Sequence, residues 1–85
     1  MKKVLMYSTR ICPYCQAAER LLKSRGVERI EKILVDENPA LREQMIQRTG
    51  LKTVPQIFIG DMYVGGYDKV AQLDRSGELE KLLEL

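Results

Sequence analysis

The sequence contains two cysteines, which are three residues apart in the segment Cys12-Pro13-Tyr14-Cys15. A cysteine pair at this spacing can form and break a disulfide, and it is a recognised redox motif where a strand passes into a helix. Residues 4–7 have the pattern of a short buried strand, and a helical apolar pattern begins at Cys12. The pair is therefore predicted to lie at the start of the first helix.

The helix start predicts unequal roles for the two cysteines. Proline is favoured at the first helical position, so Pro13 makes Cys12 the residue just before the helix. There its sulfur faces backbone N–H groups that have no partner inside the helix, and the helix dipole, with Arg10 nearby, favours the thiolate. Cys15 lies on the apolar stripe with Leu22 and is expected to be the less exposed thiol. We predict that Cys12 is the nucleophile and that Cys15 only resolves an intermediate.

Two other uses of a cysteine pair fit the sequence less well. A tetrahedral zinc site needs four nitrogen or sulfur ligands, and the chain has no histidine and no third cysteine. A permanent disulfide between residues three apart closes a very small loop and stabilises little by the chain-entropy argument. Both observations favour redox chemistry, and no metal ligands are predicted.

Two further segments are suited to binding a substrate. The proline of Thr53-Val54-Pro55 pushes Val54 into extended geometry at the start of a strand, which leaves the Val54 N–H and C=O free to pair with an extended peptide. Gly65-Gly66-Tyr67-Asp68 offers flexible backbone before a helix N-terminus, where a small carboxylate can bind. Taken alone, that turn is more often only structural. Tyr14, between the cysteines, is the aromatic residue expected to be exposed there.

The remaining periodic segments predict the fold. A helix over about 13–25 ends at Gly26, residues 30–35 form a strand, and a helix capped by Asn38-Pro39 runs to Gly50. Strands 56–59 and 62–64 form an antiparallel hairpin, and Asp68 and Ser76 are expected to cap short helices near the C-terminus. The expected order is βαβαββα. It predicts an α/β, thioredoxin-like fold: a mixed four-stranded sheet with helices on both faces.

Length and composition limit the classes of function. Residues 1–85 suffice for a single domain, and 45% apolar with 31% charged residues is a globular composition. A net charge of +2 argues against a nucleic-acid partner. No segment reaches the apolar length of a membrane span or of a signal-peptide core, so neither a membrane partner nor export is expected. The chain is predicted to be cytoplasmic.

With these motifs the sequence resembles the dithiol glutaredoxins, especially the short bacterial type, nearly end to end. The likeness rests on three ordered segments: Cys12-Pro13-Tyr14-Cys15, Thr53-Val54-Pro55-Gln56-Ile57-Phe58-Ile59 and Gly65-Gly66-Tyr67-Asp68. Thioredoxins are a poorer match, because their W-C-G-P-C segment is absent and the chain has no tryptophan. The whole chain is thus expected to be one glutaredoxin-like domain.

The resemblance implies a glutathione-dependent thiol-disulfide oxidoreductase without a metal or flavin. Cys12 would become the glutathionylated residue, Cys15 would resolve protein disulfides, and the Val54–Pro55 bond would be cis. The implied partners are glutathione and proteins that are disulfide-bonded or glutathionylated, and the chain is expected to be a monomer. The glutathione-binding residues are predicted to be Arg10, Tyr14, Thr53, Val54, Pro55, Gly66, Tyr67 and Asp68.

Two positions depart from the family pattern. Many relatives have a lysine three residues before the first cysteine, where this chain has Thr9, and Arg10 is expected to substitute for it. Many also have a second aspartate after the one that matches Asp68, near the glutathione amino group, and here that position is Lys69. Because two cations repel at close range, we expect weaker or reoriented glutathione binding.

Two alternatives stay open within the resemblance. One is a dedicated electron donor to an enzyme such as ribonucleotide reductase, reduced by thioredoxin reductase rather than by glutathione. The other is a carrier in which two chains and two glutathiones share an iron-sulfur cluster. Relatives that carry clusters mostly have glycine and serine where this chain has Pro13 and Cys15, so the oxidoreductase is the main prediction.

Overall fold

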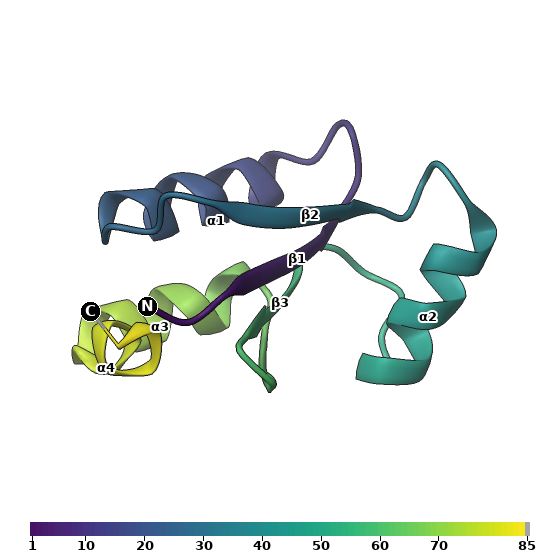
Figure 1. The fold of residues 1–85 in the computed structure, drawn as a ribbon. Coiled ribbons are helices and arrows are strands. Elements are labelled where there is room, and N and C mark those ends of the chain that lie inside the picture. Colours follow the sequence, from purple (N-terminus) through teal and green to yellow (C-terminus); the bar gives the residue numbers. More distant parts are fainter. Residues whose placement is uncertain (85) are drawn as a thin grey trace.

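The computed structural model describes residues 1–84, within which the chain forms one sheet flanked by helices (Figure 1). The elements in chain order are β1 (Val4–Ser8), α1 (Pro13–Ser24), β2 (Ile30–Leu34), α2 (Pro39–Thr49), β3 (Gln56–Ile59), β4 (Met62–Gly65), α3 (Tyr67–Ser76) and α4 (Glu78–Leu83). The bounds of all the strands and of the first two helices agree with the prediction to within one residue at each end.

The sheet has the order β2-β1-β3-β4 and is mixed, as predicted. β1 and β2 are parallel, whereas β3 is antiparallel to both β1 and β4. Tyr7 near the end of β1 therefore pairs with Gln56 at the start of β3, and Gly65 at the end of β4 pairs with Ile57. This register brings the segments after β1, before β3 and after β4 to one end of the sheet. Those segments carry the three motifs singled out in the sequence.

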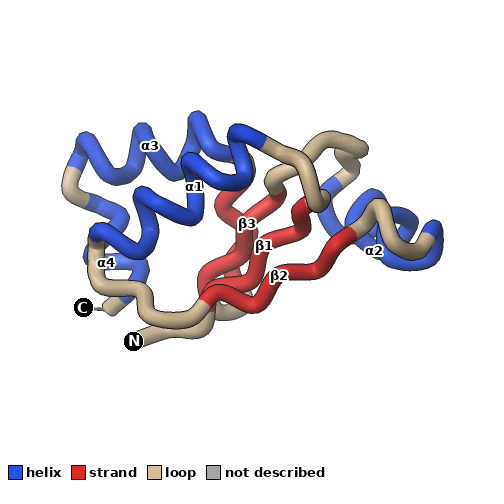
Figure 2. Tube along the Cα trace, turned by 90° about the horizontal axis from the view of Figure 1, so that it is seen from above, coloured by secondary structure: helices blue, strands red, loops and turns tan. Residues whose placement is uncertain are grey.

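The two faces of the sheet are covered by different helices (Figure 2). Val4 and Met6 of β1 face one layer, where they form a core with residues of α1, α3 and α4. Tyr7 and Phe58 face the other layer and pack with Met45 of α2. The alternation follows from the two-residue period of a strand, and it confirms the prediction of helices on both faces.

The C-terminal helices differ from the prediction. Asp68 and Ser76 do not occupy cap positions: α3 begins after Gly66 and has Asp68 in its first turn, and Gly77, with φ of 82°, lies between α3 and α4. The close packing of Gly66 on the Pro55 carbonyl oxygen fixes where α3 begins, two residues before the position that a cap at Asp68 would give. The two short helices expected near the C-terminus are both present as α3 and α4, so the full order is βαβαββαα, whereas the expected order βαβαββα counted them as one.

The other helix ends follow the sequence signals. The Asn38 side chain accepts the N–H of Ala40, Pro39 is the first residue of α2, and Gly50 ends that helix with φ of 76°. Gly26 follows α1 with φ of 98°, as predicted.

Among residues 1–84 no helix combines the length and the apolar composition that a membrane crossing requires.

Candidate active site

Cys12 occupies the position just before α1. Its backbone is extended, with φ of −153°, Pro13 is the first helical residue, and the Cys12 Sγ accepts the N–H of Cys15 at 3.1 Å. The sulfur therefore takes the place that a serine or aspartate oxygen takes in an ordinary helix cap. The N–H donated by Cys15 and the positive end of the helix dipole both favour negative charge on this atom when the disulfide is reduced.

Cys12 and Cys15 form a disulfide, with their Cα atoms 5.2 Å apart. This separation lies within the usual range for disulfides, as expected for side chains three residues apart on one helix face. In this oxidised state both residues are largely covered, with 7% of Cys12 and 4% of Cys15 exposed. The predicted difference in exposure is therefore small while the bond is intact.

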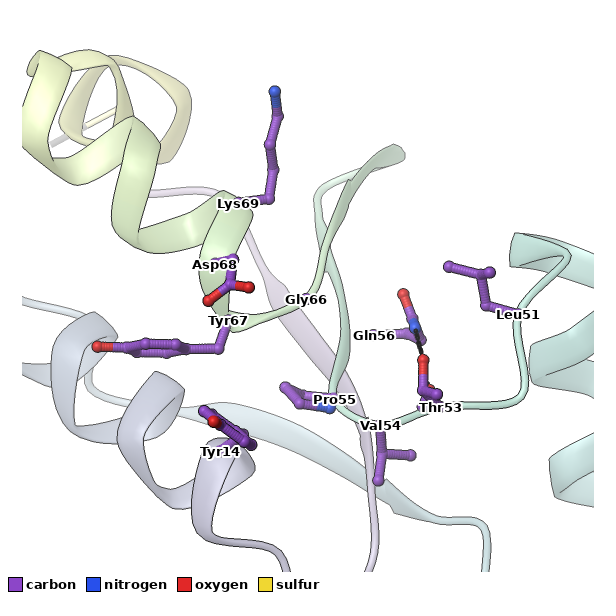
Figure 3. A pocket seen from close by; sticks show the side chains of 10 residues that line it. All are labelled: Tyr14, Leu51, Thr53, Val54, Pro55, Gln56, Gly66, Tyr67, Asp68 and Lys69. Atoms are coloured by element: carbon purple, nitrogen blue, oxygen red, sulfur yellow. Dashed lines mark hydrogen bonds between the residues drawn. The ribbon is translucent and has the colours of Figure 1, made fainter.

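A groove runs beside the start of α1 and encloses about 370 Å³ (Figure 3). It contains every predicted glutathione-binding residue except Arg10. Three residues not singled out from the sequence as contacts also belong to it: Leu51, Gln56 and Lys69. The groove is lined by Tyr14, Leu51, Thr53, Val54, Pro55, Gln56, Gly66, Tyr67, Asp68 and Lys69.

Pro55 and two tyrosines form one end of the groove. The Val54–Pro55 peptide bond is cis, as predicted, and Pro55 is buried. The rings of Tyr14 and Tyr67 lie next to it with their centroids 6.1 Å apart (Figure 3). Tyr14 is 65% exposed, so it is free to cover a ligand, and the expectation that it is exposed is confirmed.

The start of α3 packs closely against Pro55 at this end of the groove. A Cβ atom on Gly66 would lie 3.3 Å from the Pro55 carbonyl oxygen, so glycine is needed for the start of α3 to approach Pro55 this closely. The first N–H groups of a helix have no intrahelical acceptor and bind anions well. Asp68 and Lys69 follow in the first turn, and in Figure 3 the Lys69 side chain extends away from Pro55.

The disulfide borders a second hollow, of about 330 Å³, rather than the groove. Arg10 lines this second hollow, and its backbone N–H and Nε both donate to the Asp36 carboxylate at 3.3 Å. Burial would raise the pKa of Asp36, but the hydrogen bonds from Arg10 outweigh it and lower that pKa below its ordinary value. The second hollow is lined by Ser8, Thr9, Arg10, Cys12, Cys15, Gln16, Glu19, Lys32 and Leu34.

Glu19 and Lys32, which line the second hollow, belong to an ion-pair cluster that the sequence analysis did not identify. Glu19 pairs with Lys32 at 2.9 Å and with Lys23 at 3.2 Å. The hydrogen bond from Lys32 lowers the pKa of Glu19, against the opposing effect of burial and with help from Lys23. Only the pairing with Lys23, four residues on in α1, has a local sequence signal.

Within residues 1–84 no group of three or more histidine, cysteine or acidic side chains is placed to hold a metal ion.

Comparison with known proteins decides the family. A family model described as Glutaredoxin matches residues 4–64. The chain belongs to the glutaredoxin family. Glutaredoxins are glutathione-dependent disulfide oxidoreductases, and this chain is an enzyme of that class.

Relatives of known name match over nearly their full length. A glutaredoxin from Neisseria meningitidis serogroup A is 45% identical over 98% of this chain and 98% of its own. Glutaredoxin 3 from Escherichia coli K12 is also 45% identical, over 99% of this chain and 100% of its own. Among solved structures, a buckwheat glutaredoxin-glutathione complex has a TM-score of 0.88 at 31% identity, covering 98% of this chain and 77% of that one.

The glutaredoxin fold brings most of the predicted site together but separates two parts of it. Residues 53–56 of the second motif and residues 66–68 of the third share one groove with Tyr14, as the resemblance implied. Arg10 does not line this groove; it lines the second hollow and pairs with Asp36, which follows the adjacent parallel strand β2. Gln56 is the buried groove residue that sequence reasoning missed, although its place directly after Pro55 could have drawn attention to it.

Proposed function

We propose that this glutaredoxin reduces glutathione mixed disulfides and protein disulfides, with Cys12 as the nucleophile and Cys15 as the resolving thiol. The observation that carries the proposal is the position of the Cys12 Sγ, which accepts a helix N–H at the start of α1, while Tyr14, two residues further on, lines the groove. That position supplies the thiolate, and the groove supplies a place for the glutathione part of the substrate.

With a glutathionylated substrate the reaction has two exchange steps. The Cys12 thiolate attacks the glutathione sulfur, the substrate disulfide bond breaks, and the substrate leaves as a thiolate that takes a proton from water. Cys12 is then joined to glutathione. A second glutathione thiolate attacks the glutathione sulfur of this mixed disulfide, releases oxidised glutathione, and restores the Cys12 thiolate. One free glutathione is consumed, and the oxidised glutathione that leaves joins it to the glutathione taken from the substrate.

With a protein disulfide Cys15 takes part as well. Cys12 first forms a mixed disulfide with the protein and releases one protein thiolate. Cys15 then attacks Cys12, which frees the second protein thiolate and leaves the Cys12–Cys15 disulfide seen in this structure. Two glutathiones reduce that bond in turn. The short distance between the cysteines, 5.2 Å between Cα atoms, supports this second route.

The glutathione molecule is proposed to lie along the groove. Its cysteinyl unit would pair with the backbone of Val54, beside the cis proline, and its γ-glutamyl carboxylate would bind the N–H groups at the start of α3 near Tyr67 and Asp68. Tyr14 would cover the ligand from the solvent side. Arg10, also predicted to bind glutathione, lines the second hollow beside the disulfide, where it pairs with Asp36, and this arrangement assigns it no contact.

Coupled assays distinguish this proposal from a dedicated donor that depends on thioredoxin reductase. The chain is supplied with a glutathionylated peptide and NADPH, together with either glutathione plus glutathione reductase or thioredoxin reductase alone. NADPH consumption is expected only with glutathione and its reductase. Consumption supported only by thioredoxin reductase would contradict the proposal.

The activation of Cys12 has a separate test. Iodoacetamide should alkylate the reduced chain rapidly at Cys12 well below the reference thiol pKa of about 8.5, because thiolate rather than thiol reacts. The site of alkylation is read by peptide mass spectrometry over a pH series. If the pH dependence of alkylation were centred on the reference thiol pKa, the helix N-terminus would not be activating Cys12.

A further inference from the structure

Gln56, the first residue of β3, is a buried residue of the groove whose amide makes hydrogen bonds at both of its ends. It is 2% exposed. Its Nε2 donates to the Thr53 carbonyl oxygen at 3.0 Å and to the Thr53 hydroxyl at 3.2 Å (Figure 3). A carbonyl oxygen can only accept, so the nitrogen end of the amide must face Thr53. Both N–H donors of Gln56 are thereby used within the protein.

The other end of the same amide is held by Tyr63 of β4. The Tyr63 hydroxyl donates to the Gln56 Oε1, and its ring packs against Phe58 with the centroids 5.2 Å apart. Burial raises the pKa of Tyr63 above the ordinary phenol value, so the hydroxyl keeps its proton and remains a donor. Tyr63, Gln56 and Thr53 therefore form a continuous chain of hydrogen bonds from the edge strand to the groove.

This chain of hydrogen bonds orients the peptide group between Thr53 and Val54. That peptide is trans, so its C=O and N–H point in opposite directions. Gln56 fixes the carbonyl on one side, which directs the Val54 N–H to the other. Within residues 1–84 this N–H has no hydrogen-bond partner, and Val54 lines the groove. It is a donor held ready for a ligand.

We propose that Gln56 and Tyr63 are positioning residues that present the Val54 N–H to glutathione and so set the KM for the glutathione mixed disulfide. The inference rests on the proposed function, because it assigns Val54 as a glutathione contact. It differs from a direct contact, since neither donor of Gln56 is free to reach a ligand. It also predicts that Cys12 itself is unaffected, because the Cys12 sulfur depends on α1 and not on β3.

The main test is Gln56→Met, which keeps the side-chain length and removes the donors and the acceptor. The KM for a glutathionylated peptide should rise about fivefold, the effect of losing one net hydrogen bond, with kcat unchanged. The rate of Cys12 alkylation by iodoacetamide should also stay unchanged. Thr53 is exposed, so its carbonyl can turn to water in this variant and the fold is expected to persist. Gln47→Met on the exposed surface of α2 is the matched control.

Tyr63→Phe tests the chain of hydrogen bonds itself. It keeps the ring contact with Phe58 and removes only the hydroxyl, so the KM should rise by about twofold. The double variant should have the same KM as Gln56→Met alone, because Tyr63 acts through Gln56. The proposal would be overturned if the two changes raised the KM independently and additively. It would also be overturned if either variant lost Cys12 alkylation rate by the same factor as its KM rose.

A measurement without substrate separates this inference from the proposed function. The backbone amide signal of Val54 in nuclear magnetic resonance spectra should shift or broaden in Gln56→Met and stay unchanged in Gln47→Met. If the wild-type chain fails to use glutathione mixed disulfides but this signal responds, the proposed function is wrong and the positioning stands. If the Val54 signal does not respond, the positioning is wrong, whatever the activity.

Discussion

The start of α1 and the groove beside it are neighbours that are built in different ways. At the start of α1 the chemistry depends on one side-chain atom, the Cys12 Sγ, which accepts a helix N–H at 3.1 Å. In the groove the donors proposed to bind glutathione belong to the backbone, at Val54 and at the first turn of α3. Removing the sulfur should therefore abolish the reaction, whereas changes around the groove should alter affinity by degrees.

The largest effect should come from exchanging the two cysteines one at a time. Cys12→Ser should lose both deglutathionylation and protein-disulfide reduction by about a thousandfold or more, because no nucleophile replaces the thiolate. Cys15→Ser should keep deglutathionylation and lose most protein-disulfide reduction. Initial rates with a glutathionylated peptide and with a disulfide-bonded protein measure the two activities. Equal losses in the two variants would refute the assignment of roles.

A smaller effect should follow from a substitution that prevents the start of α3 from packing closely against Pro55. In Gly66→Ala the new Cβ would meet the Pro55 carbonyl oxygen at 3.3 Å, so the start of α3 must shift away. We expect a destabilisation of about 1–2 kcal/mol, measured by urea unfolding, and a severalfold rise in the KM for the glutathione mixed disulfide. Cys12 alkylation should be unchanged. If Gly66→Ala instead lowered the rate of Cys12 alkylation and left the KM normal, the groove and the start of α1 would not act separately.

Reversing the charge at the edge of the groove should act in the opposite direction. Lys69→Asp removes a cation from the first turn of α3, and glutathione binding should strengthen about two- to fivefold, since exposed charges interact weakly in water. Titration of the Cys12→Ser chain with oxidised glutathione measures this without turnover. Lys69→Met removes the positive charge without adding a negative one, so its affinity for glutathione should lie between those of Lys69 and Lys69→Asp. Unchanged affinity in both variants would mean that Lys69 does not explain the departure from the family pattern.

The smallest effect concerns the ion pair that joins α1 to α3 away from both regions. Arg25 donates two hydrogen bonds to Asp74, at 2.6 and 3.1 Å, and they lower the pKa of Asp74 below its ordinary value. The stabilisation is therefore present above the unfolded pKa of Asp74 and is lost as the pH falls through the folded value. Thermal unfolding should show a fall in Tm with acid that is slightly smaller in Asp74→Asn, with the KM unchanged at neutral pH. An identical pH dependence in the two chains would show that the pair contributes nothing.

The parts of the molecule that the sequence predicted correctly depend on local signals. Pro13 after Cys12 marks a helix start with a sulfur in the cap position, and Gly50 and Gly26 mark helix ends through left-handed backbone. The hairpin between β3 and β4 is likewise defined by a glycine turn between two apolar runs. Each of these features depends on residues within a few positions of one another, so a single sequence carries enough information.

The parts that the sequence did not predict depend on contacts between distant segments. Arg10 is held by Asp36, a residue 26 positions away that reaches it only because β1 and β2 are parallel neighbours. The roles of Gln56 and Tyr63 require the register of the β3–β4 hairpin and the face on which each side chain lies. At α3 the capping signal of Asp68 was not followed, and the helix begins after Gly66, which packs on the distant Pro55 carbonyl oxygen.

The outer strands of the sheet also bear on how the chain behaves at high concentration. β2 has one free edge and carries Glu31 and Lys32 at its centre, each paired with a charged side chain from another segment. β4, at the opposite edge, has four residues and a register irregularity against β3. Short, charged or irregular edges are poor templates for an additional strand. Both edges of the sheet, at β2 and at β4, thus oppose self-assembly of the chain into fibrils.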